Sequence, residues 1–158
     1  MATRNAERPR IRRAKASDLE AVVALDEIGT GLAKPDYWQD MFARYVRRRR
    51  TGRHFLVAES AGRVIGFVVG EVRAWEFGSP PCGWVFAVNV SPAWRERGVG
   101  GRLFDEIGLR FRKDGVEVVR TMISRADTLN LAFFRAQGLT AGPYIELERR
   151  LPPSPDNA

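Results

Sequence analysis

Apolar residues recur along the chain with two different spacings, which predict helices in some stretches and strands in others. Spacings of three and four residues place the apolar residues of a stretch on one face of a helix. Ser17-Asp18-Leu19-Glu20 predicts where the first helix starts, because Ser17 and Glu20 have the types and spacing of a capping box. The predicted helices follow Ser17, begin near Pro35, run from Gly98 to about Lys113, and run from Thr128 to Gln137.

The remaining apolar runs are rich in β-branched and aromatic residues, which favour strands. Ala61-Gly62 separates the first two runs and is typical of a hairpin turn. Strands that follow one another directly, and then alternate with helices, indicate an α/β (α+β) fold with one mixed sheet covered by helices. The predicted strands cover residues 54–59, 63–75, 84–90, 116–123 and 144–151.

Length and composition narrow the class of protein. A chain of 158 residues suits one domain, which we expect to have its core between about Ile11 and Leu151 and short tails at both ends. The single cysteine, Cys82, excludes an internal disulfide and fits a reducing compartment, and we interpret it as structural. No apolar run approaches the roughly 20 residues that span a bilayer, and residues 1–13 lack an apolar signal core, so we expect a cytoplasmic protein.

The net charge of +7 favours anionic partners, among them phosphate-bearing cofactors and nucleic acid. The densest basic cluster lies where the second predicted helix ends. We interpret it as a solvated helix end, and a lip for an acidic substrate or a nucleic-acid patch are the alternatives. His54 stands alone, without the spacing of metal ligands. The cluster consists of Arg44, Arg47, Arg48, Arg49, Arg50 and Arg53.

The segment with the clearest chemistry is Arg95-Glu96-Arg97-Gly98-Val99-Gly100-Gly101-Arg102, between a predicted strand and an amphipathic helix. The start of a helix offers free N–H groups and a partial positive charge, and glycines let those groups approach phosphate oxygens. The arginines can add charge-assisted hydrogen bonds. The segment lacks the lysine of a P-loop and the third glycine of a dinucleotide fingerprint, so neither class fits. A glycine-rich turn without a ligand is the alternative.

Two motifs in this half of the chain resemble those of the GCN5-related N-acetyltransferases (GNAT). The stretch from Val88 to Gly100 resembles the family's coenzyme A motif, and Arg95, Gly98 and Gly100 match its core, Arg/Gln-x-x-Gly-x-Gly/Ala. The stretch 130–139 resembles the second motif, a helix closed by Gly-Phe. The resemblance implies the GNAT fold, a central mixed and mostly antiparallel sheet flanked by helices. It also implies an acyltransferase that moves the acetyl group of acetyl-CoA to a primary amine without a metal.

The resemblance further implies where the cofactor binds. The strand 84–90 should splay from the strand 116–123, and the pantetheine arm should lie in the gap. Backbone groups of Val88 and Val90 would hydrogen-bond the arm, and an N–H group near Val88 would stabilise the oxyanion that forms as the amine attacks. The cofactor-binding residues expected in this way are Val88, Asn89, Val90, Arg95, Glu96, Arg97, Gly98, Val99, Gly100, Gly101, Arg102, Asn130 and Phe134.

The residues for acid–base catalysis depart from the family's pattern. Phe134 stands where many members have an acid tyrosine, and Phe86 and Ala87 occupy the region of a frequent base. Met122 and Asp127 stand where the ribosomal-protein N-terminal acetyltransferases carry a glutamate and an asparagine. The amine must still lose a proton and the thiolate must gain one, so other groups are needed.

Three residues are candidates for that chemistry: Glu71, Asn89 acting through a water, and Tyr144. The alternative reading is a non-catalytic protein that binds or senses acyl-CoA. A third reading, a nucleic-acid-binding module, would depend on the arginine cluster. Proximity and an oxyanion donor alone give substantial catalysis, so we favour the enzyme.

The resemblance implies that the amine acceptor binds against the first two helices and their loop. The expected acceptor loops are therefore residues 28–36 and 73–83. Trp75 is a candidate pocket residue and Trp38 a candidate core residue, while Asp26 and Glu27 have the charge to pair with a cationic amine. The acceptor itself, a small molecule or a peptide, is not named by any residue. A homodimer is possible by analogy with the family.

Overall fold

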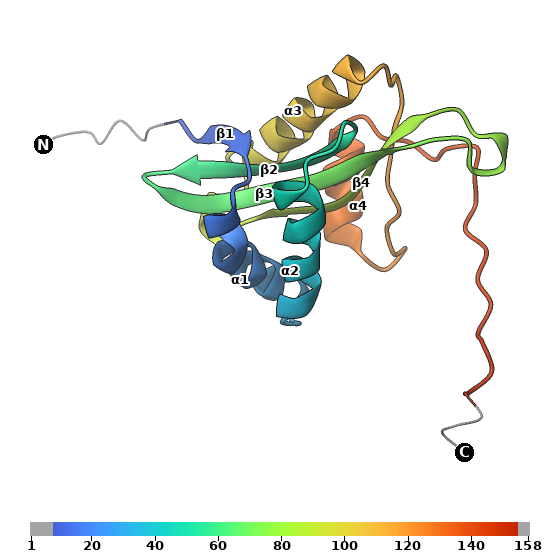
Figure 1. The fold of residues 1–158 in the computed structure, drawn as a ribbon, viewed down its shortest axis with the longest axis horizontal. Coiled ribbons are helices and arrows are strands. Elements are labelled where there is room, and N and C mark those ends of the chain that lie inside the picture. The colour runs from blue at the N-terminus through green and yellow to red at the C-terminus, as the bar shows by residue number, and fades with distance from the viewer. Residues whose placement is uncertain (1–7, 155–158) are drawn as a thin grey trace, which may run out of the picture.

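Five strands line up in chain order to form the sheet at the centre of the fold, within residues 8–154, which the computed structural model describes (Figure 1). The first four strands pair antiparallel with their neighbours, and the last pairs parallel. The mixed, mostly antiparallel sheet is therefore confirmed. The strands are β1 (Arg10–Arg13), β2 (Arg53–Ser60), β3 (Arg63–Arg73), β4 (Cys82–Val90) and β5 (Val119–Arg120).

Helices cover both faces of the sheet, as predicted. One face packs against α1 and α2, and the other packs against α3 and α4. One apolar core therefore lies on each side of the sheet. Strand β2 shows the alternation directly, since Phe55 and Val57 enter the first core and Leu56 and Ala58 the second. The helices are α1 (Leu19–Thr30), α2 (Pro35–Phe42), α3 (Val99–Lys113) and α4 (Thr128–Ala136), with short helical turns at Ala16–Asp18, Glu76–Gly78 and Pro92–Trp94.

The predicted apolar faces of two helices are confirmed. On α3, Val99, Leu103, Ile107 and Phe111 are each at most 3% exposed. On the second helix the face continues past α2 through a π-helical turn, Ala43–Arg47. Its predicted residues are all buried: Trp38, Met41, Phe42, Tyr45 and Val46.

The capping box predicted for the first helix is wrong. Helix α1 is preceded by a 3₁₀ turn whose buried Asp18 accepts a hydrogen bond from the Lys15 backbone N–H at 2.8 Å. The same carboxylate accepts from Arg12 at 2.7 Å. An aspartate held between a cation and a backbone donor is a stronger cap than the Ser17 hydroxyl, so Ser17 does not take that role.

The strand predicted over Tyr144–Leu151 is also wrong, and other strands differ in length. Residues 139–151 are irregular, and Figure 1 shows them running away from the body of the fold. Ile145 and Leu147 are each 85% exposed, so their alternation finds no partner strand within the described residues. Strand β5 has two residues instead of the predicted eight, and β3 ends at Arg73 instead of 75. Strand β1 was not predicted, because Arg10–Arg13 is short and mostly charged.

Candidate active site

A bulge in β4 shapes the sheet next to the candidate site. Val69 pairs with Ala87 and Gly70 pairs with Val85, which leaves Phe86 as an extra residue without a partner on β3. Phe86 and Ala87 consequently both lie against the core under α1 and α2. A bulge bends its strand and increases the local twist, so β4 changes direction at this point.

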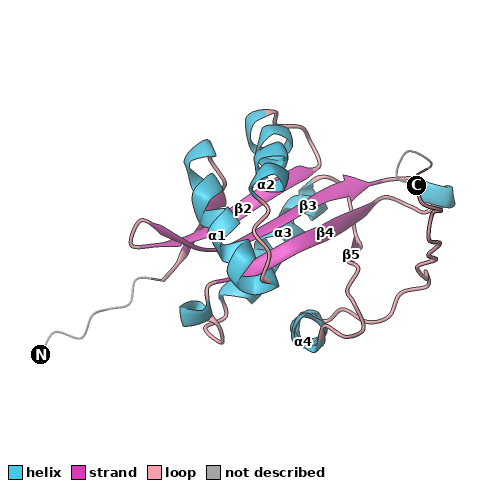
Figure 2. Cartoon of the chain, turned by 90° about the horizontal axis from the view of Figure 1, so that it is seen from below, coloured by secondary structure: helices cyan, strands magenta, loops and turns pink. Residues whose placement is uncertain are grey.

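Strands β4 and β5 separate just beyond their start, which confirms the predicted splay. Their ladder contains only the pairs Gly83 with Val119 and Trp84 with Arg120. One further link follows, from the Thr121 hydroxyl to the Val85 carbonyl at 2.7 Å. The chain after β5 then leads away from β4 towards α4 (Figure 2). The edge of β4 from 86 to 90 therefore faces a gap instead of another strand.

A cleft of about 380 Å³ fills this gap and extends under α1 and α2. The residues around it come from segments far apart in the sequence. One wall is β4, the opposite wall is the chain after β5 together with α4, and the floor reaches the loop between α1 and α2. The lining residues are Asp26, Gly29, Thr30, Lys34, Tyr37, Trp38, Phe67, Phe86, Ala87, Val88, Asn89, Arg95, Thr121, Met122, Ile123, Ser124, Asp127, Leu129, Asn130 and Phe134.

The glycine-rich segment connects β4 to α3, and of its residues only Arg95 lines the cleft. Glu96 and Gly98 adopt positive φ angles of 60° and 74°, which turn the chain so that α3 begins at Val99. The first N–H groups of α3 have no carbonyl one turn earlier to bond, as at any helix start. Arg95 lines the cleft and donates from Nε to the Val90 carbonyl at 3.4 Å. The Arg97 guanidinium lies 5.0 Å from the centre of the Trp94 ring.

Two glycines of this segment also have a packing role that sequence reasoning missed. A Cβ atom on Gly100 would lie 2.8 Å from Cε2 of Phe133 on α4. A Cβ atom on Gly101 would lie 3.3 Å from the Gln137 side chain. The absence of side chains thus lets α4 approach the first turn of α3, and no local pattern signals this contact.

Helix α4 brings Asn130 and Phe134 to the cleft. Asp127 caps the helix by accepting from the Asn130 backbone N–H at 3.1 Å, and the Asn130 amide donates to the same carboxylate at 2.7 Å. Phe134 is buried, with its ring centre 5.9 Å from that of Phe104. The residue in the usual tyrosine position is thus a packed, apolar part of the cleft wall.

Asn89 is the candidate catalytic residue that lines the cleft. Its amide Nδ2 donates to the Leu25 carbonyl of α1 at 3.0 Å. A Cβ atom on Gly29 would overlap this amide, so Gly29 allows α1 to lie this close to β4. Since Nδ2 is held by α1, the orientation of the Asn89 side chain is fixed by the protein before any ligand binds.

The structure does not bring Glu71 or Tyr144 to the cleft. Glu71 accepts a hydrogen bond from the Tyr45 hydroxyl at 2.7 Å, and it lies 3.6 Å from Arg53 Nε and 3.7 Å from Arg73 Nε. Burial, and then the hydrogen bond to Glu71, raise the pKa of Tyr45 above its usual range. Tyr144 is exposed, and the Arg120 guanidinium lies 4.7 Å from its ring centre.

On the predicted acceptor side, the cleft holds a buried carboxylate with two partners. Asp26 accepts from Trp38 Nε1 at 2.8 Å and forms an ion pair with Lys34 Nζ at 2.9 Å. The loop 28–36 contributes Gly29, Thr30 and Lys34 to the lining, whereas no residue of 73–83 lines it. Trp38 is core as predicted. Trp75 is 68% exposed and lies outside the cleft, and sequence reasoning overlooked Lys34.

No helix in the described part of the chain is long and apolar enough to cross a membrane. Among residues 8–154, no group of three or more histidine, cysteine or acidic side chains is arranged to hold a metal ion. His54 accordingly has a different partner, the Asp114 carboxylate, whose Oδ2 lies 2.6 Å from Nε2.

Fold and cleft together define a class of α/β protein in which the sheet opens between two strands beside a helix start suited to phosphate. The model of the Acetyltransferase (GNAT) family matches residues 19–139, so the chain belongs to that family. The matched region contains both motifs and every element from α1 to α4.

Curated relatives match a part of the chain. An L-2,4-diaminobutyric acid acetyltransferase from Nocardia farcinica is 38% identical over 90 residues, which are 57% of this chain and 45% of the relative. A mycothiol acetyltransferase from Thermobispora bispora is 33% identical over 99 residues, which are 61% of this chain and 33% of the relative. The chain thus spans less than half the length of the curated relatives that it matches.

A solved structure supports the fold independently. The aminoglycoside N-acetyltransferase AAC(6')-Iy in complex with CoA superposes with a TM-score of 0.79 at 18% identity. The match covers 95% of this chain and 99% of the other. At this identity the likeness shows a shared fold.

Proposed function

We propose that the protein transfers the acetyl group of acetyl-CoA to a primary amine by direct attack. The observation that carries the proposal is the cleft between the separated strands β4 and β5, which reaches Arg95 in the segment that leads into α3. In this reaction the amine nitrogen attacks the thioester carbonyl carbon and the carbon–sulfur bond breaks. The amine loses a proton, and the departing coenzyme A thiolate takes one up.

In the proposed complex, acetyl-CoA lies along the free edge of β4. Backbone groups of Val88 and Val90 hydrogen-bond the pantetheine arm as an added strand would, and an N–H group near Val88 faces the thioester oxygen. The N–H groups from Arg97 to Gly101 hold the pyrophosphate at the start of α3. Arg95 moves from the Val90 carbonyl to a phosphate, because a dianion is the stronger acceptor.

The remaining expected cofactor contacts come from both ends of the cleft. Arg97 and Arg102 add positive charge at the pyrophosphate, while Glu96 and Val99 supply backbone to the turn. Asn89, Asn130 and Phe134 line the cleft and border the reacting end of the cofactor.

For catalysis we propose that Asn89 positions the attacking amine and that water accepts its proton. Asn89 supports this role because its Nδ2 is held by Leu25 and its Oδ1 has no hydrogen-bond partner among the described residues. Glu71 is engaged by Tyr45 outside the cleft, and Tyr144 lies on Arg120, so neither geometry favours a direct role.

A thiol-release assay with a panel of amines tests the function. Asn89→Ala should lower kcat/KM by about tenfold, the effect of losing one positioning hydrogen bond to a reacting group. Glu71→Gln and Tyr144→Phe serve as matched controls and should leave kcat/KM within about twofold. A protein that acetyl-CoA stabilises thermally, but that releases no thiol with any amine, would instead be a non-catalytic acyl-CoA-binding protein.

We further propose that the acceptor is a small amine that also carries a carboxylate. The cleft is lined by two carboxylates, and both are occupied: Asp26 by Lys34 and Trp38, and Asp127 by Asn130. A polycationic amine would find only one of these carboxylates, Asp127, without a cationic partner, and both of its oxygens already accept hydrogen bonds from Asn130. Lys34 uses one of its three N–H donors for Asp26, and the other two can meet a carboxylate of the acceptor. A diamino acid is the acceptor that the name of the Nocardia relative specifies.

Competition between acceptors tests this assignment. The protein should acetylate 2,4-diaminobutyrate faster than a polyamine or an aminoglycoside at equal concentration. Lys34→Ala should reverse the preference, because it removes the cation that meets the carboxylate and frees the charge of Asp26. A wild-type preference for the aminoglycoside would refute the assignment of the acceptor while leaving acetyl transfer intact.

Two wider features complete the proposal. We place the protein in the cytoplasm, consistent with its single, buried thiol, Cys82.

We also propose a homodimer, in which the exposed apolar side chains of Ile145, Leu147 and Leu151 are covered by the second copy. Removal of residues 144–158 should then convert a dimer to a monomer in light scattering, and a monomeric full-length chain would exclude the dimer.

A further inference from the structure

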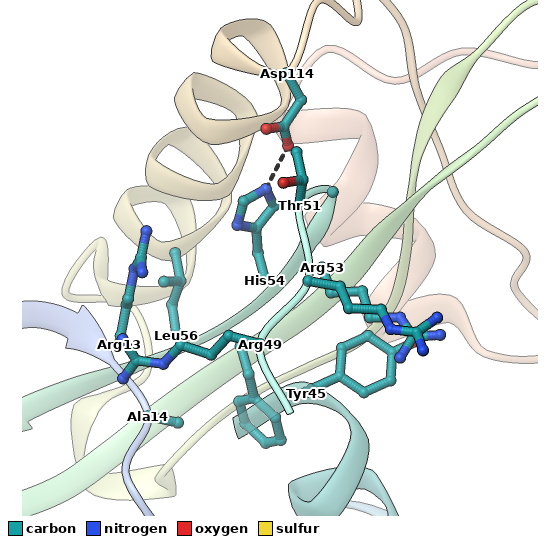
Figure 3. A pocket seen from close by; sticks show the side chains of 12 residues that line it. Arg13, Ala14, Tyr45, Arg49, Thr51, Arg53, His54, Leu56 and Asp114 are labelled. Carbon is teal, nitrogen blue, oxygen red and sulfur yellow. Dashed lines mark hydrogen bonds and ion pairs between the residues drawn. The ribbon is translucent and has the colours of Figure 1, made fainter. Parts of the chain in front are cut away.

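A second cavity, of about 360 Å³, shares no residue with the cleft of the proposed reaction. It opens where the end of β1, the turn after the π-helical segment and the start of β2 meet Asp114, the residue that follows α3 (Figure 3). We call it the basic pocket. Its lining residues are Arg13, Ala14, Tyr45, Arg49, Arg50, Thr51, Gly52, Arg53, His54, Phe55, Leu56 and Asp114.

The charges of the basic pocket do not cancel. Its lining includes four arginines and one carboxylate, Asp114, which His54 Nε2 already contacts at 2.6 Å. Arg53 lies over the Tyr45 ring and 3.6 Å from Glu71. The other three arginines, Arg13, Arg49 and Arg50, form no ion pair with any described residue. A concave surface lined by unpaired cations concentrates anions from solution.

The backbone of the pocket is fixed in a way that suits a bound ligand. Gly52 has a φ of 83°, and its carbonyl accepts from the Val72 N–H at 2.7 Å, which ties the turn to β3. A Cβ atom at this position would lie 3.2 Å from the Val72 Cβ. The neighbouring Thr51 hydroxyl has no hydrogen-bond partner within residues 8–154. A rigid turn that presents a free hydroxyl reduces the entropy lost when a ligand binds.

A solvated helix end does not account for this arrangement. Arginines after a helix are favoured by the partial negative charge of its last carbonyls, which explains Arg49 and Arg50. Arg13, however, comes from β1, and it lines the same cavity as Arg49 and His54 (Figure 3). Cationic side chains from two strands and from the end of a helix thus line one concave surface.

We propose that the basic pocket binds a small ligand through a phosphoryl group, separately from acetyl transfer. Guanidinium groups from Arg13 and Arg49 can meet different oxygens of a phosphate dianion, and the Thr51 hydroxyl can donate to a third. Binding of a nucleic-acid strand would call for aromatic faces among the cations. The aromatic rings here, Tyr45 and Phe55, are buried, and Arg53 covers the Tyr45 ring. A cavity of this size accommodates a small molecule.

Calorimetric titration with inorganic phosphate at constant ionic strength tests the proposal. Saturating coenzyme A is included so that the start of α3 is already occupied. The variant Arg97→Gln is titrated in parallel, because it weakens phosphate binding at the start of α3 and leaves the basic pocket intact. Phosphate should bind at one site. Arg13→Gln and Arg49→Gln should each lower the affinity for phosphate about tenfold, because each removes one charge-assisted hydrogen bond. Arg63→Gln, an exposed arginine outside both cavities, is the matched control and should bind phosphate as the wild type does.

Several results would overturn the basic pocket as a phosphate site. Equal affinity in Arg13→Gln and Arg63→Gln would show that the pocket does not bind phosphate. Loss of binding in Arg97→Gln alone would place phosphate at the start of α3. An equal response to acetate would remove the preference for a phosphoryl group. Tighter binding of a single-stranded oligonucleotide, with steep salt dependence, would make the surface a nucleic-acid site. None of these results depends on whether the protein transfers acetyl groups.

Discussion

Gly100 and Gly108 of helix α3 have different surroundings, and replacing them separately tests the contact between the first turn of α3 and α4. Alanine at Gly108 meets nothing within 4 Å, so it should stabilise the fold by about 1 kcal/mol through helix propensity. Alanine at Gly100 would place its Cβ 2.8 Å from the Phe133 ring. Overpacking of this kind costs about 1–3 kcal/mol, which exceeds the small propensity gain in a first helical turn.

Chemical denaturation and coenzyme A titration measure the two consequences. Gly100→Ala should lower the free energy of unfolding by about 1–2 kcal/mol, while Gly108→Ala raises it. Gly100→Ala should also lower the affinity for coenzyme A by about tenfold. Displacing α4 or the first turn of α3 moves the N–H groups that are proposed to meet the pyrophosphate. Gly108→Ala lies further along the helix and should leave this affinity unchanged.

A second substitution separates the ring contact from other effects of the methyl group. Phe133→Leu removes the ring edge, so the double variant Gly100→Ala, Phe133→Leu should lose less stability than the two single changes added together. Strict additivity would mean that the Phe133 contact is not what Gly100 accommodates. Equal gains in stability for Gly100→Ala and Gly108→Ala would refute the reasoning altogether.

The remaining predictions concern three buried groups. Burial acts to raise the pKa of Asp18, but hydrogen bonds from Arg12 and the Lys15 N–H outweigh it and hold that pKa below its usual value of 3.8. The stability it contributes is thus present above about pH 4 and is lost as the pH falls through the lower folded value, so urea unfolding of Asp18→Asn should vary less with pH in this window. Trp38→Phe removes the donor to Asp26 and should cost about 1.5–3 kcal/mol, most of which should vanish in the Asp26→Ala background, where the acceptor is absent; an undiminished cost would assign the effect to packing. Cys82 is buried, so a thiol reagent should label it far more slowly in the folded protein than in urea, and rapid labelling of the native state would contradict its position in the core.

The sequence by itself determined the elements whose residues are near neighbours along the chain. The spacing of Val99, Leu103, Ile107 and Phe111 specifies both the helix α3 and the face that it buries, because four residues make about one helical turn. The glycines before that helix indicate a phosphate site for an equally local reason. The apolar side chain of Phe134 likewise excludes it as an acid from the sequence alone.

Only the tertiary structure decided how distant segments meet. The bulge at Phe86 depends on the register of β4 against β3, and the cleft depends on where β4 and β5 part. Neither is encoded in a spacing, since both depend on packing between residues that are far apart in the chain. The same limit explains the wrong prediction for 144–151: alternation shows that a segment can form a strand, but not that a partner edge is present. It also explains why the partners of Asp26, the position of Glu71 and the gathering of Arg13 with Arg49 became visible only in the fold.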